Sequence, residues 1–296
     1  MIIIAVMYLL LYILFSSVFS LCIKWVHNRG REDILTIGAL NYIIAAVAVA
    51  AWFFVDGQQT GDVAAIATGG CMGLVYFIAF FFVIYAIKLV GVSATTVVGV
   101  LSITMPIIVA AVAWNSIPNY LQIAGIILAL MSLCLMGIKP TGSVVPSDHK
   151  PAGRFLVPLV LVFFFALCGM SRICQEAFKY MSVETQKPTY LFSAFVVTAI
   201  PSLGMLLYRK KRISPVEWGV GLVMGASNAI QTYFILKSLE HFPGYVVFTV
   251  TSAGAILFTT FAATVWLNEK LHRLTYIGII ISVFALMLLN WNPATS

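Results

Sequence analysis

Charged and amide residues interrupt an apolar run in the middle of the sequence. The segment GMSRICQEAFKY, residues 169–180, contains Arg172, Gln175, Glu176 and Lys179 and follows a nearly unbroken apolar stretch. A charged residue at the centre of a membrane-spanning helix costs about 2.5–3.5 kcal/mol on insertion scales. Arg172 and Glu176 are four residues apart, so they share one helical face and can form an ion pair. Gln175 and Lys179 flank that face.

Two interpretations of this polar face are open. In the first, the helix ends near Ile173, and the long side chains of Arg172 and Lys179 reach the lipid headgroups. In the second, the face lines a water-filled cavity, where Arg172 binds a carboxylate or phosphate group of a substrate. We favour the second, because ionisable residues within membrane helices usually face the interior of the bundle.

Glu176 is the one carboxylate that we place inside an apolar run. It is therefore the candidate proton carrier of a coupled transport process. Arg172 beside it stabilises its negative charge, which opposes protonation. Facilitated diffusion or exchange is therefore favoured over proton coupling.

Other polar and aromatic side chains fall inside apolar runs and are candidates for the lining of a cavity. Asn228 and Gln231 are three residues apart and lie on one helical face. The other candidates are Tyr76, Asn41, Tyr42 and Trp25. The alternatives are an interhelical hydrogen bond for the amides, worth about 0.6 kcal/mol, and the aromatic belt at the membrane surface for residues near the ends of the runs.

The composition indicates a polytopic membrane protein. Of 296 residues, 61% are hydrophobic and 9% are charged, and the mean hydropathy is +1.03. A soluble domain usually has about 25% charged residues. The net charge of +7 does not indicate nucleic-acid binding, because the basic residues lie mainly in short connectors between apolar runs. The five cysteines lie in apolar runs and are interpreted as packing residues.

Ten apolar runs approach the length of about 20 residues that a membrane-spanning helix needs. Backbone groups in lipid must be satisfied within the segment, so these runs are expected to be helices. The runs cover residues 2–23, 34–55, 64–87, 92–114, 119–138, 155–178, 189–208, 216–236, 245–267 and 274–291. We place Lys88, Lys179, Lys187 and Lys237 in or beside the connectors.

The two halves of the chain resemble copies of one another. GGCMG at 69–73 corresponds to GLVMG at 221–225, and GII at 125–127 recurs at 278–280. We therefore expect a first repeat at 1–138, a connector at 139–154 and a second repeat at 155–296. Each repeat has an odd number of spans, so the second enters the membrane inverted, as in many secondary transporters. The predicted fold is all-α, with ten membrane helices in two inverted five-helix repeats.

Two kinds of residue are expected to shape the helix packing. Gly69 with Gly73 and Gly221 with Gly225 form small-xxx-small pairs, which are typical of closely packed membrane helices. Pro106 is expected to kink the fourth span and is a candidate hinge.

The sequence resembles the EamA-type members of the drug/metabolite transporter superfamily. The resemblance rests on LNEKLHRLTYIGIIISVFALMLL at 267–289 and on AIKLVGVSATTVVGVLSITMPII at 86–108, with Pro106 at the mid-helix proline of the family. It implies ten helices around a central cavity and movement of small metabolites without nucleotide hydrolysis.

The charge distribution predicts an orientation. Lys and Arg are concentrated in the odd-numbered connectors, with RKKR at 209–212 as the strongest local group. Because such residues mark cytoplasmic loops, both termini are predicted to face away from the cytoplasm of an inner or plasma membrane. The expected partners are a small-molecule substrate and membrane lipids, without nucleic acid. Two complete repeats in one chain predict that a monomer functions.

The favoured function is a secondary transporter that exports or exchanges an amino acid or a similar organic solute by alternating access. One alternative is a flippase for a lipid or a lipid-linked sugar, and a less favoured one is an intramembrane enzyme. The sequence contains no G-x-x-x-x-G-K-[ST] motif and no H-E-x-x-H motif, and these are signatures of a nucleotide loop and a zinc site. We therefore expect no catalytic residues, cofactor or metal.

Overall fold

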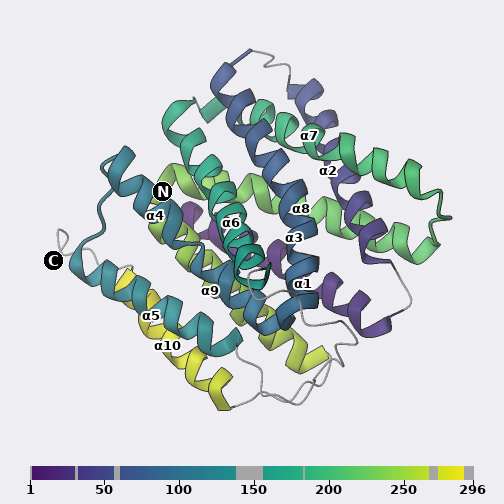
Figure 1. Ribbon diagram of the computed structural model, residues 1–296. Coiled ribbons are helices and arrows are strands. Elements are labelled where there is room, and N and C mark those ends of the chain that lie inside the picture. Colours follow the sequence, from purple (N-terminus) through teal and green to yellow (C-terminus); the bar gives the residue numbers. More distant parts are fainter. Residues whose placement is uncertain are drawn as a thin grey trace. The chain divides into compact units, whose positions relative to one another are not determined.

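The computed structural model describes residues 2–30, 33–56, 61–137, 156–182, 184–266 and 273–289. Within these ranges the regular secondary structure is helical (Figure 1). The expected connector 139–154 lies outside the described residues. The helices are α1 (Ile2–Arg29), α2 (Ile34–Asp56), α3 (Val63–Leu101), α4 (Thr104–Ala113), α5 (Tyr120–Gly137), α6 (Leu156–Met181), η1 (Glu184–Gln186), α7 (Lys187–Arg209), α8 (Pro215–His241), α9 (Gly244–Trp266) and α10 (Arg273–Leu289).

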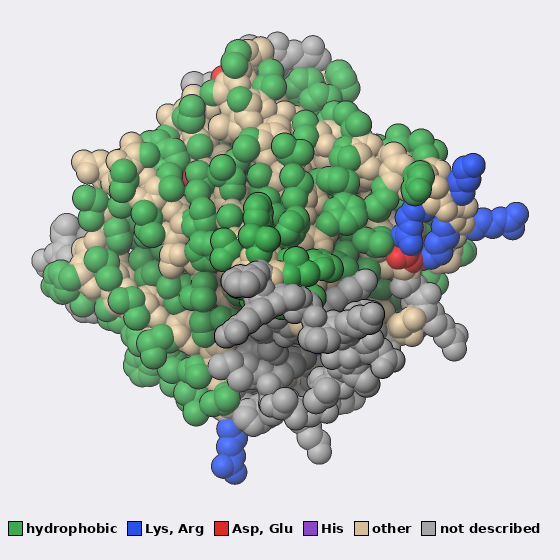
Figure 2. Space-filling model, in the orientation of Figure 1, with side chains coloured by type: hydrophobic (Ala, Val, Ile, Leu, Met, Phe, Trp, Pro, Cys, Tyr) green, Lys and Arg blue, Asp and Glu red, His purple; other side chains and the backbone are tan. Residues whose placement is uncertain are grey.

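Seven of these helices are long and apolar enough to cross a membrane. Three shorter apolar segments, Val97–Ala113, Tyr120–Ser132 and Tyr276–Leu289, accompany them. Hydrophobic side chains cover most of the described surface on the face shown in Figure 2, and basic side chains are confined to its edges. Such a surface suits a lipid environment.

The chain does not break where the sequence predicted the third connector. The helix α3 continues through Lys88, and the interruption before α4 falls at Ser102 instead. The single glycine of the predicted connector does not end the helix, because glycine costs a helix only about 1 kcal/mol relative to alanine. Pro106 has a stronger effect, because it has no N–H and its ring clashes with the carbonyl four residues earlier, that of Ser102. That carbonyl accepts from the N–H of Met105 at 3.2 Å.

The described residues fall into two compact units, each with its own internal contacts. Unit 1 comprises Met1–Phe77 and Ile173–Phe242, and unit 2 comprises Ile78–Arg172 and Pro243–Ser296. In unit 1, α2 packs against α7 and α8, and α1 packs against α8. In unit 2, α5 and α10 lie side by side (Figure 1), and α9 contacts α4 and α5.

Glycines allow close approach of the helices in unit 1. A Cβ added at Gly69 or Gly73 on α3 would overlap backbone carbonyl groups of α7. On α8, a Cβ at Gly221 would meet the side chain of Leu40 on α2. A Cβ at Gly225 would lie 2.8 Å from the carbonyl oxygen of residue 41. These positions bring α3 against α7 and α8 against α2.

Serines join α5 to α10 in unit 2. The Ser132 hydroxyl donates to the carbonyl of Gly278 at 2.6 Å and lies 2.5 Å from the hydroxyl oxygen of Ser282. Both serine side chains are fully buried. Buried hydroxyl groups need such partners, because their transfer out of water is otherwise unfavourable.

Candidate functional site

Arg172 is half-buried in unit 2 and contacts the break between α3 and α4. Its Nη1 donates to the hydroxyl of Ser102 at 2.5 Å. The same atom lies 3.4 Å from the carbonyl oxygens of Gly99 and Cys168. Neither interpretation of Arg172 drawn from the sequence anticipated these partners. The guanidinium group holds polar atoms of the α3 end, where the regular helical hydrogen bonds stop.

Gln175 lies in unit 1 and joins α6 to α3. Its side chain is buried, and Nε2 donates to the hydroxyl of Tyr76 at 3.2 Å and lies 3.6 Å from the sulfur of Met72. The hydroxyl of Tyr42 on α2 donates to the carbonyl of Tyr76 at 3.3 Å. Glu176 is fully buried on the same part of α6. Polar groups from three helices therefore meet in this part of unit 1.

A second polar group joins α2 to α8 through side-chain amides. Asn228 donates to the side-chain oxygen of Asn41 at 3.3 Å, and Gln231 donates to that of Asn228 at 3.1 Å. Asn41 and Asn228 are buried. Asn41 and Tyr42 are neighbours in sequence, so α2 contributes to both polar groups. The three amides form an interhelical hydrogen-bond network.

Trp25 lies in a different part of unit 1. It packs against a buried hydrophobic cluster of Val26, Ile37 and Met224. The guanidinium carbon of Arg29 lies 4.1 Å from the centroid of the Trp25 ring. The described contacts of Trp25 are therefore hydrophobic and cation–π, near the C-terminal end of α1.

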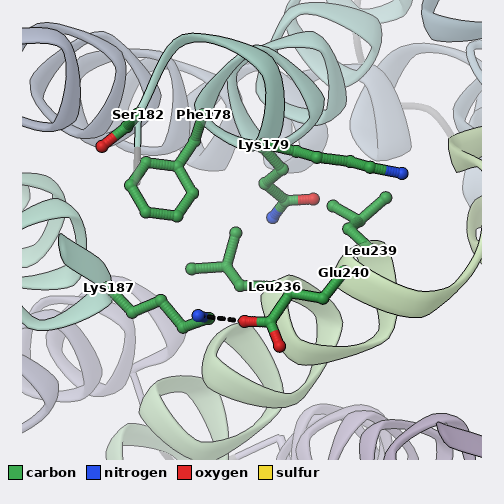
Figure 3. Close-up of a pocket in the computed structure, with 8 residues that line it drawn as sticks. Phe178, Lys179, Ser182, Lys187, Leu236, Leu239 and Glu240 are labelled. Carbon is green, nitrogen blue, oxygen red and sulfur yellow. Dashed lines mark ion pairs between the residues drawn. The ribbon is translucent and has the colours of Figure 1, made fainter. Parts of the chain in front are cut away.

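A pocket of about 140 Å³ lies beside Gln175 in unit 1 (Figure 3). Lys187 at the start of α7 forms an ion pair with Glu240 in the last turns of α8, and both side chains are buried. Lys237 lies 3.3 Å from the other oxygen of Glu240, and Lys179 donates to the carbonyl of Phe242 at 3.1 Å. The lining residues are Gln175, Phe178, Lys179, Ser182, Lys187, Leu236, Leu239 and Glu240.

The sequence prediction placed these lysines in or beside connectors. Lys179, in the last turn of α6, and Lys187, the first residue of α7, do lie beside a connector, whereas Lys237 lies within α8. Helix α6 continues past Lys179, α7 begins at Lys187, and α8 continues past Lys237. Two features of the sequence indicated that Lys187 and Lys237 lie on helices. Pro188 in the first turn of α7 marks a helix start, and Lys237 with Glu240 has the i, i+3 spacing of an intrahelical pair.

Apolar helices that can cross a membrane, with amides and an ion pair buried among them, define a multi-pass membrane protein. The model of the EamA-like transporter family matches residues 3–138 and again residues 153–291. The chain therefore belongs to the EamA-like transporter family, within the drug/metabolite transporter superfamily.

Two further comparisons agree with the extent of this match. An uncharacterized protein of Haemophilus influenzae is 24% identical over 223 residues, which is 74% of each chain. A crystal structure of a protein superposes with a TM-score of 0.72 and 17% identity, and covers 97% of this chain and 96% of the other. The second comparison shows that the two chains share a fold.

Proposed function

We propose that the protein is a secondary transporter that moves a small organic solute, such as an amino acid, across an inner or plasma membrane by alternating access. The observation that carries this proposal is the family match over both halves of the chain. Export or exchange is the proposed direction, without nucleotide hydrolysis. The two halves are proposed to be inverted repeats, because each contains an odd number of apolar runs.

The amide side chains of unit 1 support the proposed transport of a polar solute, because they are polar groups inside a largely apolar protein. Asn41, Asn228 and Gln231 connect α2 and α8, and Gln175 with Tyr76 connects α6 and α3. Amides present donors and acceptors without a net charge. A polar solute can exchange its water contacts for contacts with such groups. We therefore propose these residues, rather than Arg172, as the first ones to test for solute binding.

Solute counterflow in proteoliposomes tests the proposed function. Purified protein is reconstituted into vesicles loaded with one unlabelled solute from a panel of amino acids, organic acids and nucleosides, and uptake of the labelled solute is followed. We expect saturable counterflow for one solute class that ATP does not stimulate. Counterflow indistinguishable from that of protein-free vesicles for the whole panel would contradict the proposal.

Two variants make this experiment specific. Asn228→Leu removes the central amide of the α2–α8 network and is expected to lower counterflow at least about tenfold, because the two other amides lose a partner. Thr264→Val is the control, since the described hydrogen bond of Thr264 goes to the carbonyl of Thr260 within α9. The control is expected to keep the counterflow of the unaltered protein.

A further inference from the structure

The amide oxygen of Gln175 is buried beside the pocket without a hydrogen-bond donor among the described residues. The side chain is only 4% exposed, and its nitrogen is engaged by α3. Buried polar atoms are satisfied in the great majority of folded structures, because burial removes their water. The oxygen therefore marks a position where an N–H or O–H group of a ligand would bind.

The pocket also presents charges of both signs. Figure 3 shows Lys187 and Glu240 facing each other across one side of it. Glu240 is engaged by Lys187 and Lys237. The described hydrogen bond of Lys179 goes to a neutral carbonyl group, so this ammonium retains donors for a further partner.

Two further carboxylates lie behind the lining residues. Asp62 accepts a hydrogen bond from Ser182, and Glu176 is fully buried next to Gln175 on α6. The lining therefore contains both basic and acidic side chains, with further carboxyl groups next to it. A ligand that carries both a negatively charged acceptor and a hydrogen-bond donor fits this arrangement better than a simple anion does.

The size and the apolar wall of the pocket limit the ligand further. A cavity of roughly 150 Å³ in a protein core holds one benzene ring, which has the bulk of a six-heavy-atom molecule, and this pocket measures about 140 Å³. Phe178, Leu236 and Leu239 form its apolar wall. A short aliphatic carbon chain can lie against that wall.

We propose that this pocket binds a short monocarboxylate that carries an amino or hydroxyl group on the carbon next to the carboxylate. The amino or hydroxyl group donates to Oε1 of Gln175, and the carboxylate accepts from Lys179. The aliphatic part contacts Phe178 and Leu236. The assignment of this ligand as the transported solute rests on the proposed function, whereas binding in the pocket does not.

A matched ligand series tests the binding by calorimetry on the detergent-purified protein. L-Alanine, L-lactate and propionate differ only in the group on the second carbon, and 2-amino-1-propanol lacks the carboxylate. We expect L-alanine or L-lactate to bind at least about tenfold more tightly than either of the other two compounds. Propionate lacks the group that donates to Gln175, and the amino alcohol lacks the carboxylate that accepts from Lys179.

Three variants locate the binding. Gln175→Met removes the amide oxygen and is expected to bring the preference over propionate below about threefold, and Lys179→Met is expected to weaken all carboxylates. Gln122→Met makes the same chemical change on α5 in unit 2, outside both proposed sites, and is expected to keep the preference. Equal binding of propionate, absence of binding by the whole series, or an unchanged preference in Gln175→Met would overturn the proposal.

Binding and counterflow experiments with the same ligands distinguish failure of the pocket assignment from failure of the transporter proposal. If L-alanine or L-lactate binds with the expected preference and the vesicles show no counterflow, the pocket is supported and the transporter proposal fails. If counterflow of another solute occurs and no ligand of the series binds, the transporter proposal stands and the pocket assignment fails.

Discussion

The ion pair between Lys187 and Glu240 is buried on both sides, with side-chain exposures of 4% and 9%. Replacing Lys187 with methionine leaves Glu240 with Lys237 as its remaining ionic partner among the described residues. Removal of one member of a buried pair typically costs about 3–5 kcal/mol. We expect Lys187→Met to lower the free energy of unfolding, measured by detergent denaturation, toward this range.

Lys237→Met is the matched control, because Lys237 contacts the same carboxylate but is 26% exposed. Partly exposed pairs contribute about 1 kcal/mol or less, so this variant is expected to lose little stability. The double variant Lys187→Met with Glu240→Gln should lose less than the sum of the two single losses, because neither member is then left as a buried unpaired charge. Additive losses would show that the two side chains act independently.

The hydrogen bond between Arg172 and Ser102 can be tested with variants of both residues. A hydrogen bond to a charged group contributes about 1.5–3 kcal/mol, so Arg172→Met and Ser102→Ala are each expected to destabilise the protein. Because the two groups contact each other at 2.5 Å, the double variant should show a clear coupling energy in thermal unfolding. Additive effects in this cycle would contradict a structural role for Arg172 at the helix break.

At the scale of the helices, two glycines of α8 offer a comparison within one element. A Cβ at Gly225 would lie 2.8 Å from the carbonyl oxygen of residue 41 and from the Cβ of Ile44, so α2 and α8 would have to separate. Overpacking of this kind costs about 1–3 kcal/mol. We expect Gly225→Ala to be destabilising, as measured by thermal unfolding in detergent.

Gly219 on the same helix is the control, because a Cβ there meets nothing within 4 Å. Alanine is favoured over glycine inside a helix by about 1 kcal/mol, so Gly219→Ala is expected to be neutral or stabilising. If the two substitutions changed stability by the same amount and in the same direction, helix propensity and not close packing would explain both.

The helices could be predicted from the sequence, whereas several of their ends could not. Apolar runs of near-membrane length identify spans, because crossing the lipid interior requires hydrophobic side chains along about 20 consecutive residues. A helix end depends instead on a few local partners. Lys187 at the start of α7 pairs with Glu240 on α8, and a partner on another helix leaves no periodic signal in the sequence.

The contacts of the candidate site could likewise be predicted only in part from the sequence. Asn228 and Gln231 could be placed on one helical face from their spacing, and the structure joins them by a hydrogen bond. The partner of Asn228 on another helix, Asn41, could be nominated but not paired with it. The contact of Arg172 with Ser102 was missed because it depends on where Pro106 stops α3.

At the scale of the molecule, the contact units do not coincide with the two segments that the family model matches. Unit 1 contains the first 77 residues together with residues 173–242, so it draws helices from both matched segments. Helices α3 and α6 each contribute residues to both units. Internal repetition could be detected from the sequence, since it depends on self-similarity, but it does not specify which helices pack together.

One end of unit 1 is strongly basic. Arg209 donates to the carboxylate of Asp33 at 2.5 Å, and Lys211 donates to that of Glu217 at 2.8 Å. Tyr208 and Trp218 beside them are 88% and 50% exposed, and exposed aromatic side chains of this kind are enriched at the membrane surface. The ion pairs hold the basic segment against the N-terminal ends of α2 and α8.

The two ends of unit 1 therefore carry different charge patterns, and this difference argues for an orientation. Lys210 and Arg212 at the basic end are exposed, whereas Lys187 and Lys237 at the other end are paired with Glu240. Excess Lys and Arg in short loops favours the cytoplasmic side. We therefore expect the basic end to be cytoplasmic, and the N-terminal end of α1, where Tyr8 stacks on His241 at the end of α8, to face away from the cytoplasm.

Single cysteines introduced into a variant whose native cysteines have been replaced can test this orientation in intact cells. Thr185 in η1 and Arg212 are both exposed and lie at opposite ends of α7. A membrane-impermeant thiol reagent should label Thr185→Cys in intact cells, and should label Arg212→Cys only after the membrane is opened. The reverse pattern would place the basic segment outside the cell, and charge bias would then have failed to set the orientation of this chain.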